Sequence, residues 1–260
     1  MSSKEFHTGI VLSGGGMRCM AQAGILQALG ESGIRPAILS GTSAGAIVAC
    51  FYSLGYSAER IADIIQRAKL FDWTHISLRK PGLFDMASFE KLFREYFGNY
   101  TFESLPIPLV VNATDIITGE SVYFSEGELV KPLLASCCIP VVFDPVYFNE
   151  RYLVDGGIVN NFSLEPIRER CHHIIGIHTN AVSNTAPTGK ADVLDRSFHF
   201  ALSASMKAKT HACDLFIEPP NMSRFSMFDF SKSREIFEAG YQYAKSMQSQ
   251  IDQFISDTAA

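Results

Sequence analysis

The chain has 260 residues, is 47% hydrophobic and carries a formal net charge of −5. This length and apolar content suffice for one large α/β domain or two small ones, and they exclude a disordered chain. The acidic balance and the absence of a run of Lys and Arg argue against a nucleic-acid-binding protein.

The first residues lack the basic and apolar segments of a secretory signal, and no stretch of about 18 apolar residues predicts a membrane span. We therefore expect a cytoplasmic protein, with peripheral contact at a membrane surface left open. The six cysteines have no CxxC spacing. This favours reduced core thiols over disulfides or a zinc site, and we expect neither a metal nor another cofactor.

The first part of the chain alternates between buried strands and apolar helices. Strands are expected at residues 8–12 and 37–39, and helices at 17–29 and 46–51. Such alternation predicts a three-layer α/β/α fold with a mainly parallel central sheet.

The remaining elements follow from apolar periodicity and from turn residues. Helices are expected at residues 58–68, 88–97, 128–136, 164–170, 192–209 and 233–254. Strands are expected at residues 108–114, 119–124, 141–143, 151–154, 173–178 and 214–217. The strands at 141–143 and 151–154 flank a polar turn at Asn149-Glu150. An apolar loop at residues 70–86 and a polar loop at 181–195 interrupt the pattern.

A Gly-x-Ser-x-Gly sequence, Gly41-Thr42-Ser43-Ala44-Gly45, joins the second strand to the second helix. At such a turn the serine hydroxyl stands above the sheet, and the flanking glycines leave room for a substrate. This predicts Ser43 as a nucleophile. The alternative is a tight turn of small residues in which Thr42 or Ser43 only caps the helix, and the pentapeptide alone leaves both interpretations open.

The first strand leads into a glycine loop, Gly14-Gly15-Gly16, that opens a helix. Backbone amides in such a loop point into one concavity and can stabilise an oxyanion. A nucleotide-binding loop is the competing interpretation. It is weaker, because the Gly-Lys-Ser or Gly-Lys-Thr of a P-loop is absent and Cys19 stands where a dinucleotide-binding loop needs glycine.

Two residues could act as the base for Ser43. Ser43, Asp155 and His178 occur in the order of an α/β-hydrolase triad. However, the serine follows only the second strand, and His178 lies within an apolar strand where a structural histidine is the more common outcome. Asp155 ends a strand and precedes two glycines, although Asp-Gly is also a common turn signal.

Three motifs together resemble the signatures of the patatin-like phospholipases: Gly14-Gly15-Gly16-Met17-Arg18, Gly41-Thr42-Ser43-Ala44-Gly45 and Asp155-Gly156-Gly157. The resemblance implies a Ser43–Asp155 dyad without histidine, with the loop amides as the oxyanion hole. It implies supporting roles for the other residues of the motifs, which are Met17, Arg18, Gly41, Gly45, Gly156 and Gly157. Arg18 matches the basic residue that ends the family's loop and is expected to fix its shape.

Cys19 departs from the family pattern, in which the loop usually continues with glycine. The run Ala135-Ser136-Cys137-Cys138 before Pro140 resembles the family's Ala-Ser-x-Ala-x-Pro segment, with cysteines in place. We expect no nucleophilic role for Cys137 or Cys138.

These observations predict a single domain over residues 1–260, with the motifs at about 7–180 and a completing part at about 190–256. The predicted activity is hydrolysis of phospholipids or related carboxylic esters. The alternatives are an esterase with a Ser43/Asp155/His178 triad, or a lipid-binding or regulatory protein on the same scaffold. Oligomeric state is not predicted by the sequence.

Overall fold

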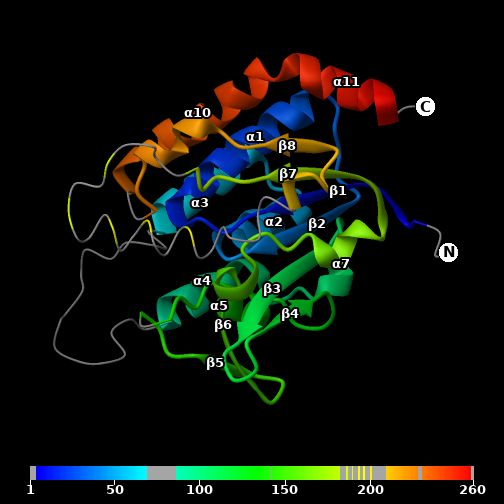
Figure 1. Cartoon of the computed structure of the whole chain (residues 1–260). Coiled ribbons are helices and arrows are strands. Elements are labelled where there is room, and N and C mark those ends of the chain that lie inside the picture. Colours follow the sequence, from blue (N-terminus) through cyan, green and yellow to red (C-terminus); the bar gives the residue numbers. More distant parts are fainter. Residues whose placement is uncertain are drawn as a thin grey trace.

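The computed structural model describes residues 4–68, 86–140, 142–181, 209–227 and 230–258, together with positions 186, 189, 193, 196 and 200. Within these residues an eight-stranded mixed sheet is flanked by helices (Figure 1). Its strand order is β5-β6-β3-β2-β1-β7-β8, and β4 pairs with β3. The expected α/β fold is confirmed.

One half of the sheet is parallel. It contains β1 (Phe6–Leu12), β2 (Ile38–Thr42), β3 (Leu109–Asp115), β7 (Cys171–Ile177) and β8 (Leu215–Ile217). Every residue of β2 and β3 is buried. Their largely apolar sequences reflect this burial, because helices cover parallel strands on both faces.

The other half is antiparallel and contains β4 (Glu120–Phe124), β5 (Val146–Phe148) and β6 (Arg151–Asp155). The expected strand at residues 141–143 was wrong, because Val142 and Phe143 lie in a turn and the partner of β6 is β5. Asn149 and Glu150 both have positive φ, 50° and 60°. Such a two-residue turn requires the partner strand to end directly before it, which places the strand at β5.

The strands β2 and β6 meet end to end beside β3. Residues 111 and 112 of β3 pair with both β2 and β4, whereas residues 113–115 pair with both β4 and β6. Since a strand has only two sides, β2 and β6 lie on the same side of β3. The chain that leaves β2 therefore emerges at the end of β6.

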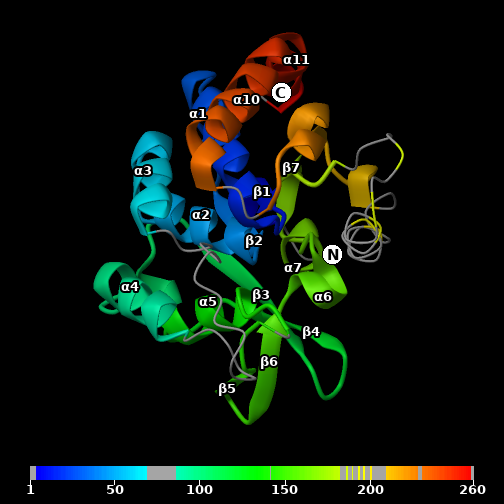
Figure 2. The ribbon, with the colours of Figure 1, turned by 90° about the vertical axis from the view of Figure 1, so that its left-hand side faces the viewer.

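Most helices cover one face of the sheet (Figure 2). The helices are α1 (Cys19–Glu31), α2 (Ala44–Ser53), α3 (Ala58–Ala68), α4 (Ala87–Phe97), α5 (Val130–Ser136), α6 (Gly157–Asn160), α7 (Glu165–Arg168), α10 (Ser233–Ser246) and α11 (Gln248–Thr258). The side chains of α1, α2, α3 and α10 share a large apolar cluster with β1 and β2. A smaller cluster on the opposite face includes Ile167 of α7.

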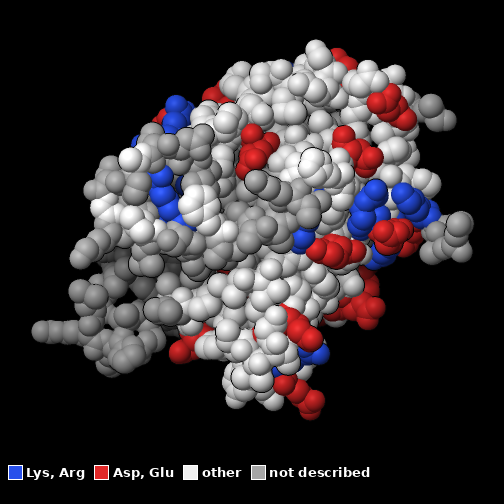
Figure 3. Space-filling view, in the orientation of Figure 1, with Lys and Arg blue, Asp and Glu red and all other residues white. Residues whose placement is uncertain are grey.

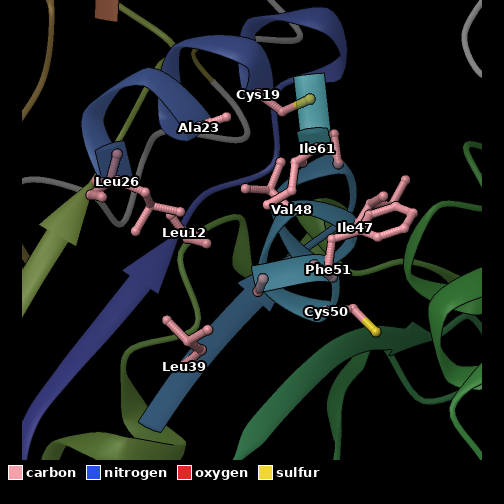
Figure 4. Close-up of a cluster of buried hydrophobic side chains, with 14 of the residues drawn as sticks. Leu12, Cys19, Ala23, Leu26, Leu39, Ile47, Val48, Cys50, Phe51 and Ile61 are labelled. Carbon is pink, nitrogen blue, oxygen red and sulfur yellow. The ribbon is translucent and has the colours of Figure 1, made fainter. Parts of the chain in front are cut away.

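The large cluster fixes the strand-to-helix turns at which the predicted motifs lie. Figure 4 shows Leu12 and Leu39 of the strands in the same cluster as Ile47 and Phe51 of α2. All four side chains are fully buried. Full burial of such side chains contributes about 1.5–3 kcal/mol each, so the ends of β1 and β2 are held rigidly.

Helices α1 and α10 approach each other through two glycines, and they run side by side in Figures 1 and 2. A Cβ on Gly24 would lie 2.8 Å from the Tyr241 nitrogen, and one on Gly240 would lie 2.6 Å from the Cα of Ala21. Neither distance is tolerated by real side chains. The close packing of α10 against α1 therefore depends on glycine at both positions.

The long C-terminal helix expected at residues 233–254 is two helices, α10 and α11, which separate at Met247. No Gly or Pro marks this break. The expected helix at 164–170 is the shorter α7, and α6 was not expected. The expected loops at 70–86 and 181–195 and the helix at 192–209 lie almost entirely outside the described residues. In the part of the chain that is described, no helix is both long and apolar enough to cross a bilayer.

Candidate active site

Ser43 occupies a strained turn between β2 and α2. Its φ of 53° and ψ of −129° lie in a region that non-glycine residues rarely adopt. A Cβ on Gly41 would lie 2.6 Å from the Cα of Ala46, and one on Gly45 would lie 2.7 Å from the Leu12 carbonyl oxygen. The two glycines thus permit a turn too tight for larger residues, as the Gly-x-Ser-x-Gly pattern predicted.

The Ser43 hydroxyl donates a hydrogen bond to Asp155. The distance from Oγ to Oδ2 is 2.5 Å, and both residues are 7% exposed. The other carboxylate oxygen, Oδ1, accepts the Gly157 amide at 2.8 Å. Burial raises the pKa of Asp155 to about 6, against the opposing effect of these two hydrogen bonds. A carboxylate with this pKa is a better proton acceptor than an exposed aspartate and is still ionised at neutral pH.

Two buried residues outside the three motifs hold the serine backbone. The Ser43 amide donates to Ser136 Oγ at 2.8 Å, and Ser136 Oγ donates to the Asn112 carbonyl at 2.6 Å. Sequence reasoning noticed the segment around Ser136 but assigned it no contact with the nucleophile. Its resemblance to a family segment was the signal that could have revealed this role.

The glycine loop lies directly beside the serine. A Cβ on Gly14 would lie 3.1 Å from the Cβ of Ser43. The Gly14 amide, however, donates to the Asn161 carbonyl at 3.2 Å. The amides of Gly15 and Gly16 bond to no residue in the described part of the chain. Of the three expected donors, these two are therefore available to a ligand.

Hydrogen bonds to the segment that precedes α10 hold the glycine loop in place. The Met17 amide donates to the Met227 carbonyl at 2.8 Å, and Nε of the buried Arg18 donates to the Phe225 carbonyl at 2.9 Å. Arg18 thus ties the loop to a segment that is distant in the sequence.

Within the described residues, His178 is hydrogen-bonded to neither Ser43 nor Asp155. Its Nδ1 is 2.7 Å from Oε1 of Glu218, and its ring stacks on Phe216. Both oxygens of Asp155 are occupied by other donors. The geometry therefore does not assemble a Ser43/Asp155/His178 triad.

The cysteines near the site are buried thiols. Burial raises the pKa of Cys19 and of Cys138 to about 12, and raises that of Cys137 well above its usual value. Since the thiolate is the nucleophilic form, these residues are inert at neutral pH.

Charged groups on the face shown in Figure 3 are mixed. At its right-hand edge, basic and acidic side chains lie next to one another. Ion pairs in the described structure include Arg170 with Glu5, at 2.9 Å, and Lys209 with Glu165, at 2.6 Å. The described residues on the face in Figure 3 form no broad basic surface.

Comparisons with known proteins identify the family of the chain. Residues 10–167 match the family model described as patatin-like phospholipase. An uncharacterized NTE family protein of Mycobacterium tuberculosis is 34% identical over 163 residues, which cover 59% of this chain and 27% of that protein. The lysophospholipase NTE1 of Kluyveromyces lactis is 26% identical over 274 residues, which cover 90% of this chain and 19% of that protein.

The chain thus spans less than a third of the length of these two curated relatives. Among solved structures, VipD from Legionella pneumophila superposes with a TM-score of 0.59 at 15% sequence identity. The match covers 97% of this chain and 68% of the VipD chain, and it supports the fold.

Proposed function

Because the chain belongs to the patatin-like phospholipase family, we propose that it is a serine lipid acyl hydrolase in which Ser43 and Asp155 form the catalytic dyad. The observation that carries the proposal is the 2.5 Å hydrogen bond from Ser43 Oγ to Asp155 Oδ2, which joins two buried residues. Lipid hydrolysis is the activity of the family. The catalytic roles of Ser43 and Asp155 are our inference.

In the proposed reaction, Ser43 Oγ attacks the ester carbonyl carbon while its proton passes to Asp155 Oδ2. The protonated Asp155 then donates this proton to the departing alcohol. In the second half water attacks the acyl carbonyl carbon while Asp155 takes a proton from the water. Asp155 returns this proton to Ser43 Oγ as the acyl–oxygen bond breaks, and the fatty acid leaves. The Gly157 amide keeps Oδ1 in place throughout, so that Oδ2 faces the serine.

The negative charge on the carbonyl oxygen needs donors that are already oriented. The amides of Gly15 and Gly16 are the proposed donors, because the Gly14 amide is occupied by Asn161. Loss of one such donor typically costs about 3–4 kcal/mol of transition-state stabilisation. Neither a metal nor a cofactor takes part in the scheme.

The substrate class is a phospholipid, a lysophospholipid or a related lipid ester. The name of the Kluyveromyces relative, lysophospholipase, makes lysophospholipid the first substrate to test.

Lipids of this class are held in membranes or micelles, so the protein has to contact the surface of these assemblies. We propose that this contact involves the hairpins β3–β4 and β5–β6, which extend beyond the ends of β1 and β2. Their most exposed apolar residues are Ile117, at 75%, and Tyr147, at 58%.

The proposal is tested by comparing purified protein with Ser43→Ala. Wild-type protein should release fatty acid from lysophospholipid or phospholipid, and p-nitrophenol from p-nitrophenyl butyrate, whereas Ser43→Ala should release neither. Equal rates for both proteins would disprove it. A lipid-binding protein on the same scaffold would bind lipid vesicles without turnover and would leave Ser43 unreactive toward a fluorophosphonate probe.

A further inference from the structure

Asn180 lies three residues beyond β7, in a buried position behind the glycine loop. Its side chain is 3% exposed, and Nδ2 donates to the Gly14 carbonyl oxygen at 2.5 Å. The side-chain nitrogen of Asn180, and not its oxygen, must face the Gly14 carbonyl, because two oxygen acceptors cannot hydrogen-bond to each other. The Gly14 carbonyl is therefore directed toward Asn180.

This contact sets the direction of the next amide. The described residues contain no cis peptide bond. In a trans peptide the C=O and N–H groups point in opposite directions, so the Gly15 N–H is directed away from Asn180. This N–H is one of the two amides proposed to stabilise the oxyanion.

The two peptides of Gly14 are restrained to different degrees. The peptide before it is held at both ends, since Gln22 Nε2 donates to the Ser13 carbonyl at 2.6 Å and the Gly14 amide donates to Asn161. For the peptide between Gly14 and Gly15, the bond from Asn180 is the only hydrogen bond within the described residues. Glycine on both sides leaves this peptide free to rotate without it.

The buried side chain of Asn180 also has a free-energy cost, which an apolar residue at this position would avoid. Its Oδ1 is buried without a hydrogen-bond partner in the described structure. An unsatisfied buried acceptor typically costs about 1–3 kcal/mol, and a leucine of similar size would not incur this cost. The one hydrogen bond that the side chain makes is to the loop.

We infer that Asn180 is a positioning residue, which orients the Gly14–Gly15 peptide so that the Gly15 amide faces the oxyanion. A rotated peptide would present a carbonyl oxygen to the developing negative charge and turn an attraction into a repulsion. This inference rests on the proposed function. It differs from a contact with substrate, because Asn180 acts only through Gly15.

The test compares Asn180→Leu and Asn180→Asp with wild-type protein on p-nitrophenyl butyrate. Both should lose about 10²-fold in kcat, as expected when an oxyanion donor is removed. KM should stay within about two-fold, because the donor acts in the transition state. The ratio of Asn180→Asp to wild-type kcat/KM should rise as pH falls, because a neutral carboxylic acid regains the donor that the carboxylate lacks.

Ile251→Ala is the stability control. Ile251 is fully buried in α11, remote from the loop, so this variant should lower the melting temperature and keep its kcat. Wild-type kcat in Asn180→Leu, or a loss found only in KM, would overturn the inference while leaving the proposed function intact. Absence of Ser43-dependent turnover in wild-type protein would overturn both the inference and the proposed function.

Discussion

Thr42 and Asp155 occupy consecutive positions along the same side of β3, opposite Asn112 and Ala113. One ends β2 and the other ends β6, and these strands approach from opposite directions. The residue after Thr42 is the strained Ser43, so its hydroxyl necessarily emerges beside the Asp155 carboxylate. The contact between two residues 112 positions apart is thus a consequence of strand register.

The pH dependence of hydrolysis should reflect Asp155. In the proposed mechanism Asp155 must be ionised to accept the proton of Ser43, and burial raises its pKa to about 6. We predict that kcat/KM is constant above this pH and falls about tenfold per pH unit below it. The profile is measured with p-nitrophenyl butyrate between pH 4.5 and 8, on protein shown to stay folded. A profile that is flat down to pH 4.5 would contradict the assignment.

Asp155→Asn should abolish hydrolysis and at the same time stabilise the fold. The pKa of Asp155 is raised from 3.8 to about 6 in the folded state, so ionisation of this group weakens folding as pH rises through this interval. The difference corresponds to roughly 3 kcal/mol at neutral pH and above. Urea unfolding at pH 8 should show the variant to be more stable than wild type.

The same comparison at pH 4 serves as the control. The wild-type carboxyl group is then largely protonated in the folded protein, and the advantage of Asn should shrink. A variant that is less stable than wild type at pH 8 would show that the carboxylate is held favourably in the fold.

Gly240→Val should lower both the stability of the fold and the kcat of hydrolysis. Its side chain would meet the Cα of Ala21, so α10 has to move away from α1. Such overpacking typically costs about 1–3 kcal/mol. The displaced helix follows the segment whose Phe225 and Met227 carbonyls hold the glycine loop, so kcat should fall as well.

Gln242→Val is the matched control for this prediction. It introduces the same β-branched residue into α10 at an exposed position. Stability and kcat should remain close to wild type when both variants are compared by thermal unfolding and ester hydrolysis. Equal behaviour of the two variants would show that the glycine contact is unimportant.

Membrane contact through the hairpins predicts a difference between soluble and vesicle substrates. Replacing Ile117 and Tyr147 by Ser should lower hydrolysis of phospholipid vesicles by about tenfold or more, since each apolar side chain contributes about 1.5–3 kcal/mol when it leaves water. Hydrolysis of soluble p-nitrophenyl acetate should not change. Tyr100→Ser is the control, because Tyr100 is 42% exposed and lies near the bridge from Thr101 to Glu128, beyond the end of β4 that is away from the turn of the β3–β4 hairpin. A uniform loss on both substrates would contradict a surface role.

The sequence predicted the elements that depend on local patterns. The strained turn at Ser43 and the glycine loop could be recognised because the steric need for small residues is local. The partner of β6 was misplaced, because strand pairing depends on the geometry of the turn at Asn149-Glu150 and not on apolar content alone. The break at Met247 carries no Gly or Pro signal, so the local pattern did not predict it.

The polar residues around the site were the least predictable. Ser136, Asn161 and Asn180 come from three different elements, and only the folded chain brings them to Ser43 and to the glycine loop. Their residue types carry no signal on their own. The assignment of Asp155 was possible only through the combination of three motifs, and its contact with Ser43 depends on the register of β3.

The rate at which a fluorophosphonate modifies Ser43 tests the proposed dyad most directly, because it requires no knowledge of the natural lipid. The reaction is followed by intact mass in wild type, Asp155→Asn and His178→Ala. We predict that wild type and His178→Ala acquire one phosphonyl group on Ser43 at similar rates, and that Asp155→Asn reacts at least about 10²-fold more slowly. Modification of Asp155→Asn at the wild-type rate, or loss of reactivity in a folded His178→Ala, would contradict the Ser43–Asp155 dyad.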